Sequence, residues 1–489
     1  MHPYILSYFM LFYENSLYRS EGLCYNPFTI NFYDEGIMRF NSFSEMISYR
    51  AGLTPEDPAL RYEELGLLRE MSWSSFEKLV TDSENALPAS FSTGFFLNEP
   101  SPGLLALFFA AVRTGRRIVL LDANAPEEVL RAQILETGID ALLGDEELAE
   151  ELSDALSEPA EEKADRGILF YTSGTTSRQK AVVLTEKSLC ASAYNGGALL
   201  PLSPSDNLLS VLPLNHVFGF VCGLLWGLSC GASVSLGRGP RHYADDCAFF
   251  RPTAVSVVPL LLGFLLQHGL LNDELKLILI GAGDCPAPLI TAAKTRGVRV
   301  SFGYGLTETS SGVALSLGDD PYAMTVCPDD IITIAADGEI LIEAPTCVMQ
   351  AYFKRPEETE AVLQNGVLHT GDLGRFDEKG LLHITGRKKE ILVLPDGTKI
   401  YLPEYEQDLS QALPGRDLAV FLWKGNPILL IHGDPSEKEE LFRKIRGVVS
   451  ARPRGQQIKD IFFSAKPLPR TAAGKLRRWE LNKTEEVKA

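Results

Sequence analysis

Tyr171-Thr-Ser-Gly-Thr-Thr-Ser-Arg-Gln-Lys180 is the stretch around which this sequence is organised. Two apolar runs flank it, Gly167-Ile-Leu-Phe-Tyr171 and Ala181-Val-Val-Leu184, and both are typical of buried strands. The loop between them carries hydroxyl groups, one glycine and a terminal lysine, which are groups that bind a polyphosphate. It is not a Walker A loop, because a second glycine is missing and no helix opens after Lys180. Taken alone, the stretch fits a phosphate loop and a plain polar hairpin connection equally well.

The chain before this loop alternates strands with helices. Phe95-Phe-Leu97 and Ile118-Val-Leu-Leu121 have the pattern of buried parallel strands. Residues 102–113 and 125–137 have the pattern of helices, the second with Pro126 in its first turn. This alternation predicts an α/β sheet covered by helices.

Two strands predicted after the loop end in glycine-rich segments. Leu275-Lys-Leu-Ile-Leu-Ile280 runs into Gly281-Ala-Gly283, and Val298-Arg-Val-Ser-Phe302 runs into Gly303-Tyr-Gly-Leu-Thr-Glu-Thr309. Ligands of open α/β sheets sit at the carboxyl ends of strands. Three such strand ends in one chain therefore favour a binding site over coincidence.

The last third of the sequence changes character. Residues 331–386 contain short apolar runs separated by Asp-Gly and Lys-Gly turns, which predicts a small antiparallel subdomain or barrel. Gly386-Arg-Lys-Lys-Glu390 reads as a charged joint. The remaining hundred or so residues have the pattern of a compact α+β domain.

Composition narrows the class of protein. A chain of 489 residues is too long for one ordinary core, so we expect two or more domains. Its hydrophobic share of 45% and charged share of 22% are those of a soluble globular protein. A net charge of −18 argues against a nucleic-acid-binding surface over the whole protein. The eight cysteines are scattered, with no Cys-x-x-Cys pair, which is typical of a reduced, cytoplasmic protein.

The first 37 residues differ from the rest. Pro3–Tyr13 is apolar and aromatic, yet it is too short to span a bilayer and lacks the flanks of a signal peptide, so no transmembrane segment is predicted. We expect residues 1–37 to be an extension outside the folded protein, with Met38 or Met46 as the true start. A membrane-touching anchor is the alternative.

Six motifs stand in one order along the chain: Tyr171–Lys180, Leu212–Gly219, Gly303–Thr309, Thr370-Gly-Asp372, Gly386–Ile391 and Pro469-Arg-Thr-Ala-Ala-Gly-Lys475. On these motifs, from Phe43 to Arg478, the sequence resembles the AMP-forming acyl-adenylating superfamily of acyl-CoA synthetases, adenylation domains and luciferases. The segments Pro213–Gly219 and Arg387–Leu394 are most similar to medium- to long-chain acyl-CoA and acyl-carrier-protein synthetases.

This resemblance implies an α/β fold and a two-step reaction. Residues 38–388 would form a large AMP-binding domain of two α/β sheet subdomains plus a small β-barrel-like subdomain, and residues 389–489 a small, mobile α+β lid. With ATP and Mg²⁺, a carboxylate would displace pyrophosphate and form an acyl-adenylate. The thiol of CoA, or of a carrier-protein phosphopantetheine, would then displace AMP. Such chemistry relies on positioning and on neutralising charge.

The resemblance assigns the nucleotide site residue by residue. Adenine would lie along the glycine-rich strand ends, the ribose would bond to Asp372 helped by Arg387, and Tyr304 would stack on the ring. The pyrophosphate would lie on the hydroxyls and lysine of the opening loop. The full set is Thr172, Ser173, Gly174, Thr175, Thr176 and Lys180 for phosphate, and Gly281, Ala282, Gly283, Gly303, Tyr304 and Gly305 for adenine.

The resemblance also assigns catalytic groups. Thr307 would bond a phosphate oxygen, and Glu308 would hold Mg²⁺, which prefers carboxylate and phosphate oxygens. Lys475 would reach the α-phosphate as a mobile point charge. His216 would lie beside the carboxylate, and Lys389 would be the hinge of the moving lid.

Plainer interpretations exist for these residues. Asp372 would otherwise close a turn, Glu308 would cap a helix, and Lys475 would be one solvated charge among several. The order of the motifs favours the functional role for all three. For His216, a hydrogen-bonded core histidine is nearly as good an explanation.

The acyl pocket is predicted from Asn215-His-Val-Phe-Gly-Phe-Val-Cys222, which contains no acidic residue. A buried substrate amine would lack a counter-charge there, so an α-amino acid is disfavoured. A fatty acid or another apolar acid, including an aromatic one, is expected instead. The walls would be Phe218, Phe220, Val221 and Leu224, which otherwise belong to an ordinary helix core.

Three loop positions depart from the family pattern, since Ser177, Gln179 and Ala181 stand where Gly, Pro and Gly are usual. If Ser177 has to adopt a positive φ, the change costs about 1 kcal/mol or more. We still expect ATP to bind, with slower loop closure.

Two alternatives to a CoA ligase remain open at this stage. Pro403 stands one place later than usual, which leaves the acceptor thiol undecided between CoA and a carrier protein. A non-catalytic homologue that only binds a nucleotide or adenylate is the rival from another class. The presence of Lys475, Glu308 and Asp372 argues against that rival.

Overall fold

The computed structural model describes residues 38–158, 166–172, 179–283, 285–394, 399–470, 476 and 478–481. The predicted extension at residues 1–37 lies outside this set. In the described part of the chain, no helix is long and apolar enough to cross a membrane.

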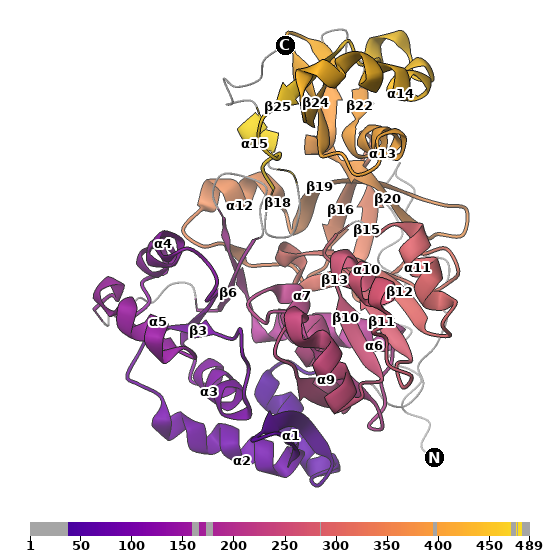
Figure 1. Ribbon diagram of the computed structural model, residues 1–489. Coiled ribbons are helices and arrows are strands. Elements are labelled where there is room, and N and C mark those ends of the chain that lie inside the picture. The colour runs from indigo at the N-terminus through magenta and orange to yellow at the C-terminus, as the bar shows by residue number, and fades with distance from the viewer. Residues whose placement is uncertain are drawn as a thin grey trace, which may run out of the picture. The chain divides into compact units, whose positions relative to one another are not determined.

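The first sheet has six strands within the described ranges, in the order β17-β7-β6-β4-β3-β5. Its strands are β3 (Ser92–Phe96), β4 (Arg117–Leu121), β5 (Ala141–Leu143), β6 (Ile168–Tyr171), β7 (Ala181–Leu184) and β17 (Ala351–Tyr352). Phe95 and Phe170 point to the face covered by α3 (Pro102–Arg113), whereas Phe96 and Leu169 point to the face covered by α4 (Glu127–Thr137). The alternation predicted for an α/β sheet is therefore confirmed (Figure 1).

The helix boundaries follow local capping chemistry. The Ser101 side chain accepts from the Leu104 N–H at 3.2 Å and opens α3 at the predicted residue. Pro126 is not in the first turn of α4, as we expected, but is its N-cap, because its ψ of 142° is extended. Gly138 ends α4 with a φ of +64°.

The second sheet joins the parallel and antiparallel parts of the chain in one ladder. Its order is β15-β16-β19-β20-β14-β13-β12-β11-β10-β8-β9-β1-β2. The strands with parallel partners are β1 (Pro58–Glu64), β8 (Asn207–Ser210), β9 (Ser233–Leu236), β10 (Ala254–Val257), β11 (Leu277–Ile280) and β12 (Arg299–Leu306). The others are β2 (Leu67–Ser72), β13 (Ser311–Ser316), β14 (Met324–Val326), β15 (Ile331–Ile334), β16 (Glu339–Glu343), β19 (Val367–Phe376) and β20 (Leu382–Arg387), with β18 (Leu363–Gln364) beside β19.

Two expectations about this sheet need correction. The antiparallel strands do not close into a barrel within the described residues; they continue the second sheet through β12, which pairs with β11 on one side and β13 on the other. Residues Gly303–Leu306 are not a loop after a strand. They are the second half of β12, because β13 folds back antiparallel and extends it.

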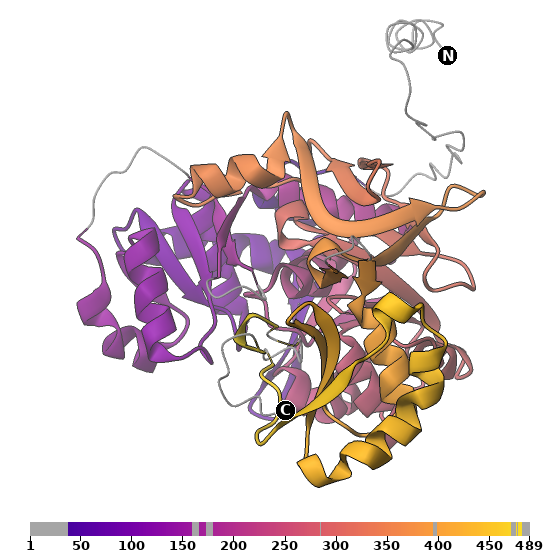
Figure 2. The ribbon, with the colours of Figure 1, turned by 90° about the horizontal axis from the view of Figure 1, so that it is seen from above.

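The main core lies between the two sheets. It contains α6 (Glu186–Leu199), α8 (Trp226–Cys230) and the π-helical turn η3 (Val221–Leu225), which follows the short helix α7 (Val217–Phe220). Phe220 is fully buried there, with ring centroids 5.3 Å from Phe108 and 5.6 Å from Phe170. Helices α9 (Tyr243–Phe250), α10 (Pro259–His268) and α11 (Ala287–Lys294) cover the other face of the second sheet (Figures 1 and 2).

The chain after residue 390 builds a core of its own. It has the hairpin β21 (Ile391–Val393) and β22 (Lys399–Tyr401) and the three-stranded sheet β23 (Leu418–Trp423), β24 (Asn426–His432) and β25 (Asp460–Ser464). Helices α13 (Leu402–Ala412) and α14 (Lys438–Ser450) pack on this sheet through Leu409 and Ile445. The α+β character predicted for this region is confirmed.

Candidate active site

The opening stretch connects two antiparallel neighbours. Strands β6 and β7 pair up to Tyr171 and Ala181; beyond them Thr172 N–H donates to the Lys180 carbonyl at 2.9 Å, and Lys180 N–H donates to Thr172 Oγ1 at 3.2 Å. The ends of the predicted phosphate loop are thus brought side by side. Residues 173–178 lie outside the described set, and with them the predicted cradle residues Ser173, Gly174, Thr175 and Thr176 and the φ expected at Ser177.

The Lys180 side chain is held by a carboxylate. Its Nζ lies 2.7 Å from Glu358 Oε2 and 4.3 Å from the centre of the Tyr352 ring. Glu358 lies in α12 (Pro356–Val362) and also pairs with Arg355 at 2.9 Å. The Lys180 ammonium and the Arg355 guanidinium lower the pKa of Glu358 below its ordinary value.

Tyr352 links this lysine to the predicted magnesium ligand. Its hydroxyl donates to Glu308 Oε1 at 2.6 Å, and burial raises the pKa of the Tyr352 phenol, so the group remains a donor. Glu308 lies in the short 3₁₀ turn Thr307–Thr309 that follows β12. Its Oε2 has no hydrogen-bond partner among the described residues. A carboxylate oxygen near the lysine predicted to bind phosphate would suit Mg²⁺ that arrives with phosphate oxygens.

The predicted ribose group is assembled by β12, β19 and β20. Tyr304 Oη donates to Asp372 Oδ2 at 2.8 Å, and Arg387 Nε lies 2.8 Å from Asp372 Oδ1. Asp372 and Arg387 are register partners across β19 and β20. Asp372 is buried. The burial of Tyr304 itself, together with the negative charge of Asp372, raises the pKa of the Tyr304 phenol. The three residues assigned from separate motifs therefore contact one another.

The segments predicted to contact adenine, around Gly281 and Gly305, are packed closely against their neighbours. Ala282, between Gly281 and Gly283, has a φ of +62°. A Cβ on Gly281 would lie 2.8 Å from the Phe218 ring, and a Cβ on Gly305 would lie 1.8 Å from the Ser311 carbonyl oxygen. A larger residue at Gly281 would displace the Phe218 ring, and one at Gly305 would force the backbone of β13 away.

His216 does not lie in the core. It is exposed and is the N-cap residue of α7, so the alternative of a hydrogen-bonded core histidine does not hold. Desolvation nevertheless lowers the pKa of its imidazole. Its role beside the carboxylate stays a prediction.

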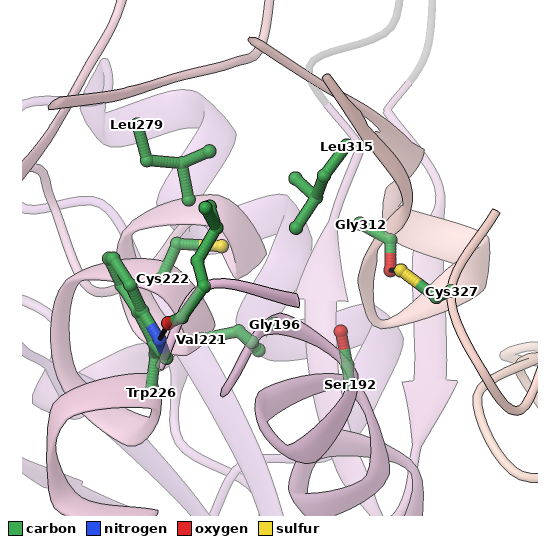
Figure 3. A pocket seen from close by; sticks show the side chains of 10 residues that line it. Ser192, Gly196, Val221, Cys222, Trp226, Leu279, Gly312, Leu315 and Cys327 are labelled. Atoms are coloured by element: carbon green, nitrogen blue, oxygen red, sulfur yellow. Dashed lines mark hydrogen bonds between the residues drawn. The ribbon is translucent and has the colours of Figure 1, made fainter. Parts of the chain in front are cut away.

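A small apolar cavity is lined by residues of α6, η3, α8, β11 and β13 (Figure 3). Its volume is about 20 Å³, room for about one water molecule. Gly312 and Leu315 in its wall pair with Gly305 and Gly303 across β12 and β13. Most of the lining is apolar, from Leu200, Val221, Trp226, Leu279 and Leu315 with Gly196 and Gly312. The three polar side chains in the lining are Ser192, Cys222 and Cys327.

The predicted acyl-pocket residues divide between this cavity and the core. Val221 lines the cavity. Phe220 and Leu224 are fully buried in the core between the sheets, which was the alternative for them. Phe218 is half-buried against Gly281. A helix presents only part of its surface to any cavity, and whether this cavity takes the acyl group stays a prediction.

The predicted hinge follows β20 directly. The backbone of Lys389 lies in the single turn Lys388–Glu390, and Lys388 Nζ pairs with Asp337 and Glu339, each at 2.7 Å. Lys388, which these two ion pairs hold in place, therefore comes immediately before the predicted hinge residue. Lys475 lies outside the described residues.

Three residues of this region were missed from the sequence: Tyr352, Glu358 and Ser192. Tyr352 reaches the site because β17 pairs with β7, which brings Tyr352 opposite Val182. The local sequence does not predict that β17 pairs with β7, because the two strands are far apart in the chain. Ser192 is one of several small polar residues in α6, and only the packing shows which one faces the cavity.

Comparison with known proteins agrees with this geometry. A profile of the AMP-binding enzyme family matches residues 49–353. The chain belongs to this family. Among curated relatives, the indoleacetate–CoA ligase of Aromatoleum aromaticum is 29% identical over 89% of this chain and 96% of its own. The 2-succinylbenzoate–CoA ligase of Bacillus thuringiensis subsp. konkukian is 28% identical over 74% of this chain and 82% of its own.

Solved structures of AMP-binding enzymes share the fold. The o-succinylbenzoate CoA synthetase of Bacillus subtilis, in complex with its acyl-adenylate intermediate, matches with a TM-score of 0.77 at 24% identity, over 91% of this chain and 99% of its own. ATP-bound MatB from Rhodopseudomonas palustris matches with a TM-score of 0.74 at 22% identity, over 92% and 99%. The superfamily and the class of AMP-forming ligase predicted from the motifs are confirmed by these relatives.

Proposed function

We propose that this protein activates an aromatic carboxylic acid with ATP and Mg²⁺ and transfers the acyl group to the thiol of CoA. Family membership and the named CoA ligases support the reaction. The observation that carries it is the convergence of two sets of side chains on the strand and turn 299–309. Asp372 and Arg387 meet Tyr304 at one end, and Lys180 and Tyr352 approach Glu308 at the other.

These positions suit the first half-reaction. The ribose hydroxyls would donate to Asp372, which Arg387 and Tyr304 hold in place. Glu308 would bind the Mg²⁺ that accompanies ATP, and this ion would offset phosphate charge. Lys180 would leave Glu358 and meet the departing pyrophosphate. Attack of the carboxylate on the α-phosphate then gives the acyl-adenylate and pyrophosphate, with positive charge placed where negative charge accumulates.

The fatty acid that the sequence suggested is not proposed again. The relatives are named for 2-succinylbenzoate and indoleacetate, which are aromatic acids. At about 20 Å³, the cavity with Trp226 in its wall admits neither a long chain nor an aryl group as it stands, so the choice between them rests on the relatives. An aryl group would enter only if buried wall side chains, such as Leu200, Leu279 and Leu315, moved aside.

The test is pyrophosphate release with ATP, Mg²⁺ and matched panels of aryl, fatty and amino acids, with and without CoA. We expect release with aryl acids and thioester formation when CoA is added. No release with any acid would support the non-catalytic alternative. Release without a CoA thioester, followed by transfer to a carrier-protein phosphopantetheine, would identify a carrier-protein ligase instead.

Lys475, assigned by the resemblance alone, has a separate test. Lys475→Ala should reduce acyl-adenylate formation at least about a hundredfold, since it removes the charge that would reach the α-phosphate. The same variant should still convert a supplied acyl-adenylate and CoA into thioester. Adenylation at the wild-type rate would remove this lysine from the mechanism.

A further inference from the structure

The polar atoms in the wall of the cavity differ in whether they have a hydrogen-bond partner. Cys222 Sγ lies 3.4 Å from Ser311 Oγ, and Cys327 Sγ lies 3.9 Å from the Gly312 carbonyl oxygen, so both have partners. Trp226 Nε1 donates to the Leu200 carbonyl at 3.0 Å. Ser192 Oγ is buried and has no hydrogen-bond partner among the described residues. The serine is only 3% exposed.

The position of Ser192 is as informative as its lack of a partner. Figure 3 shows its hydroxyl on the side of the cavity away from Leu279 and Leu315. Leu279 lies two residues before Gly281, and Leu315 is the register partner of Gly303. The side of the cavity formed by these two leucines therefore adjoins the predicted nucleotide segments. An acyl group whose carboxylate meets ATP there would extend towards Ser192.

The charge of the cavity limits what Ser192 can bind. None of the described residues that line it carries a charge. A charged substituent would be buried without a counter-charge, which is strongly unfavourable. A neutral donor or acceptor would instead satisfy the serine hydroxyl, and a buried hydroxyl without a partner is costly.

We propose that Ser192 determines specificity by hydrogen bonding to a neutral polar substituent, such as a hydroxyl or a ring N–H, on the ring of the aromatic acid, at the end remote from the reacting carboxylate. This inference rests on the proposed function and makes it narrower. It disfavours an acid with a second carboxylate at that end of the molecule. The preferred substrate is an aryl acid with an uncharged hydrogen-bonding group.

The test compares isosteric ring substituents. Benzoates and phenylacetates with a hydroxyl at ring position 2, 3 or 4 are paired with their methyl counterparts, and kcat/KM is measured from pyrophosphate release. At one ring position, we expect the hydroxyl acid to exceed the methyl acid by about five- to tenfold in the wild type. Ser192→Ala should abolish or reverse that preference.

Ser229→Ala is the matched control. Ser229 is as buried as Ser192, but its Oγ donates to the Trp226 carbonyl at 3.0 Å and it does not line the cavity. The control should keep the wild-type preference. Ser192→Ala should unfold at or above the wild-type temperature, because it removes a buried hydroxyl that has no partner.

The outcomes separate this inference from the proposed function. If no aryl acid, substituted or not, releases pyrophosphate, the proposed function fails. If unsubstituted aryl acids react but the methyl acids are equal or better at every position, the Ser192 inference fails alone. The same holds if Ser192→Ala leaves the preference unchanged. A preference for the carboxylate-bearing phthalates would overturn the neutral character of the subsite.

Discussion

In the proposed function, the Lys180–Glu358 ion pair would make ATP binding an exchange of partners for the lysine. The lysine would have to leave a carboxylate 2.7 Å away before it reaches phosphate. Glu358 is 41% exposed, so solvent weakens the pair and its free energy is less than about 1 kcal/mol. In the proposed function, the contact would lower ATP affinity modestly and keep the lysine near the phosphates.

Glu358→Gln should bind ATP about two- to fivefold more tightly, because the lysine no longer gives up a charged partner. Titration calorimetry with ATP and Mg²⁺ measures this. Glu357→Gln, one residue earlier and exposed, is the control and should leave the affinity unchanged. Weaker ATP binding by Glu358→Gln would mean that the carboxylate orients Lys180 rather than competing for it.

Tyr304→Phe should raise the KM for ATP about tenfold. The change keeps the ring but removes the donor 2.8 Å from the buried Asp372 carboxylate, and hydrogen bonds to charged groups are worth about 1.5–3 kcal/mol. ATP–pyrophosphate exchange measures the KM. Tyr304→Leu, which also loses the ring face, should be affected more strongly. Equal KM values for Tyr304→Phe and the wild type would confine the hydroxyl to a structural role.

At the scale of elements, β12 is the strand that organises the site. Its first half pairs parallel with β11 and its second half antiparallel with β13. Tyr304 lies in that second half, and Glu308 lies in the turn that follows it. The backbone of β13 approaches so closely at Gly305 that even a methyl group is excluded.

Gly305→Ala should lower the free energy of unfolding by about 1–3 kcal/mol, because the added Cβ would lie 1.8 Å from the Ser311 carbonyl oxygen. Urea unfolding measures the loss. Gly312→Ala, the register partner on β13, is the control, since the nearest atom to its Cβ is 3.9 Å away. Equal stability of the two variants would show that the two strands separate at little cost.

The elements also show what a single sequence can reveal. Helix α3 was predicted to the residue because capping and periodicity are local. The ribose group could be assigned because each motif carries its own residue, and its role stays a prediction. The continuation of β11 and β12 into the antiparallel strands was missed, since edge pairing depends on segments far apart. Tyr352 and Glu358 were missed for the same reason: their roles arise from where β17 and α12 pack.

At the scale of the whole molecule, one buried acid links stability to pH. Burial, with the charge of Asp329 nearby, raises the pKa of Asp330 to about 8. Asn195 Nδ2 donates to Asp330 Oδ2 at 3.4 Å, and Asp330 Oδ1 has no hydrogen-bond partner among the described residues. Because the folded pKa lies above the unfolded one, the proton on Asp330 stabilises the fold fully below about pH 4. That stabilisation is lost as the pH rises to about 8.

Asp330→Asn should therefore gain stability relative to the wild type as the pH rises from about 4 to about 8, with no further change above that range. Urea unfolding at a series of pH values measures the difference. Asp273→Asn, at an exposed position, is the control for replacing an aspartate by asparagine. A constant difference for Asp330→Asn would mean that this acid titrates normally in the folded protein.

The hairpin of β1 and β2 at the edge of the second sheet has a consequence for synthesis in the cell. Leu60 pairs with Val234, so strand β1 leaves the ribosome long before the strand it pairs with. At about 5–20 residues per second, the wait is roughly 10 to 35 s. During that time a nascent segment with Leu65, Leu67 and Leu68, which stay exposed even in the finished fold, has no sheet to join. Throughout this interval the edge of β1 that later joins β9 is unpaired, which favours binding by a chaperone that recognises apolar segments.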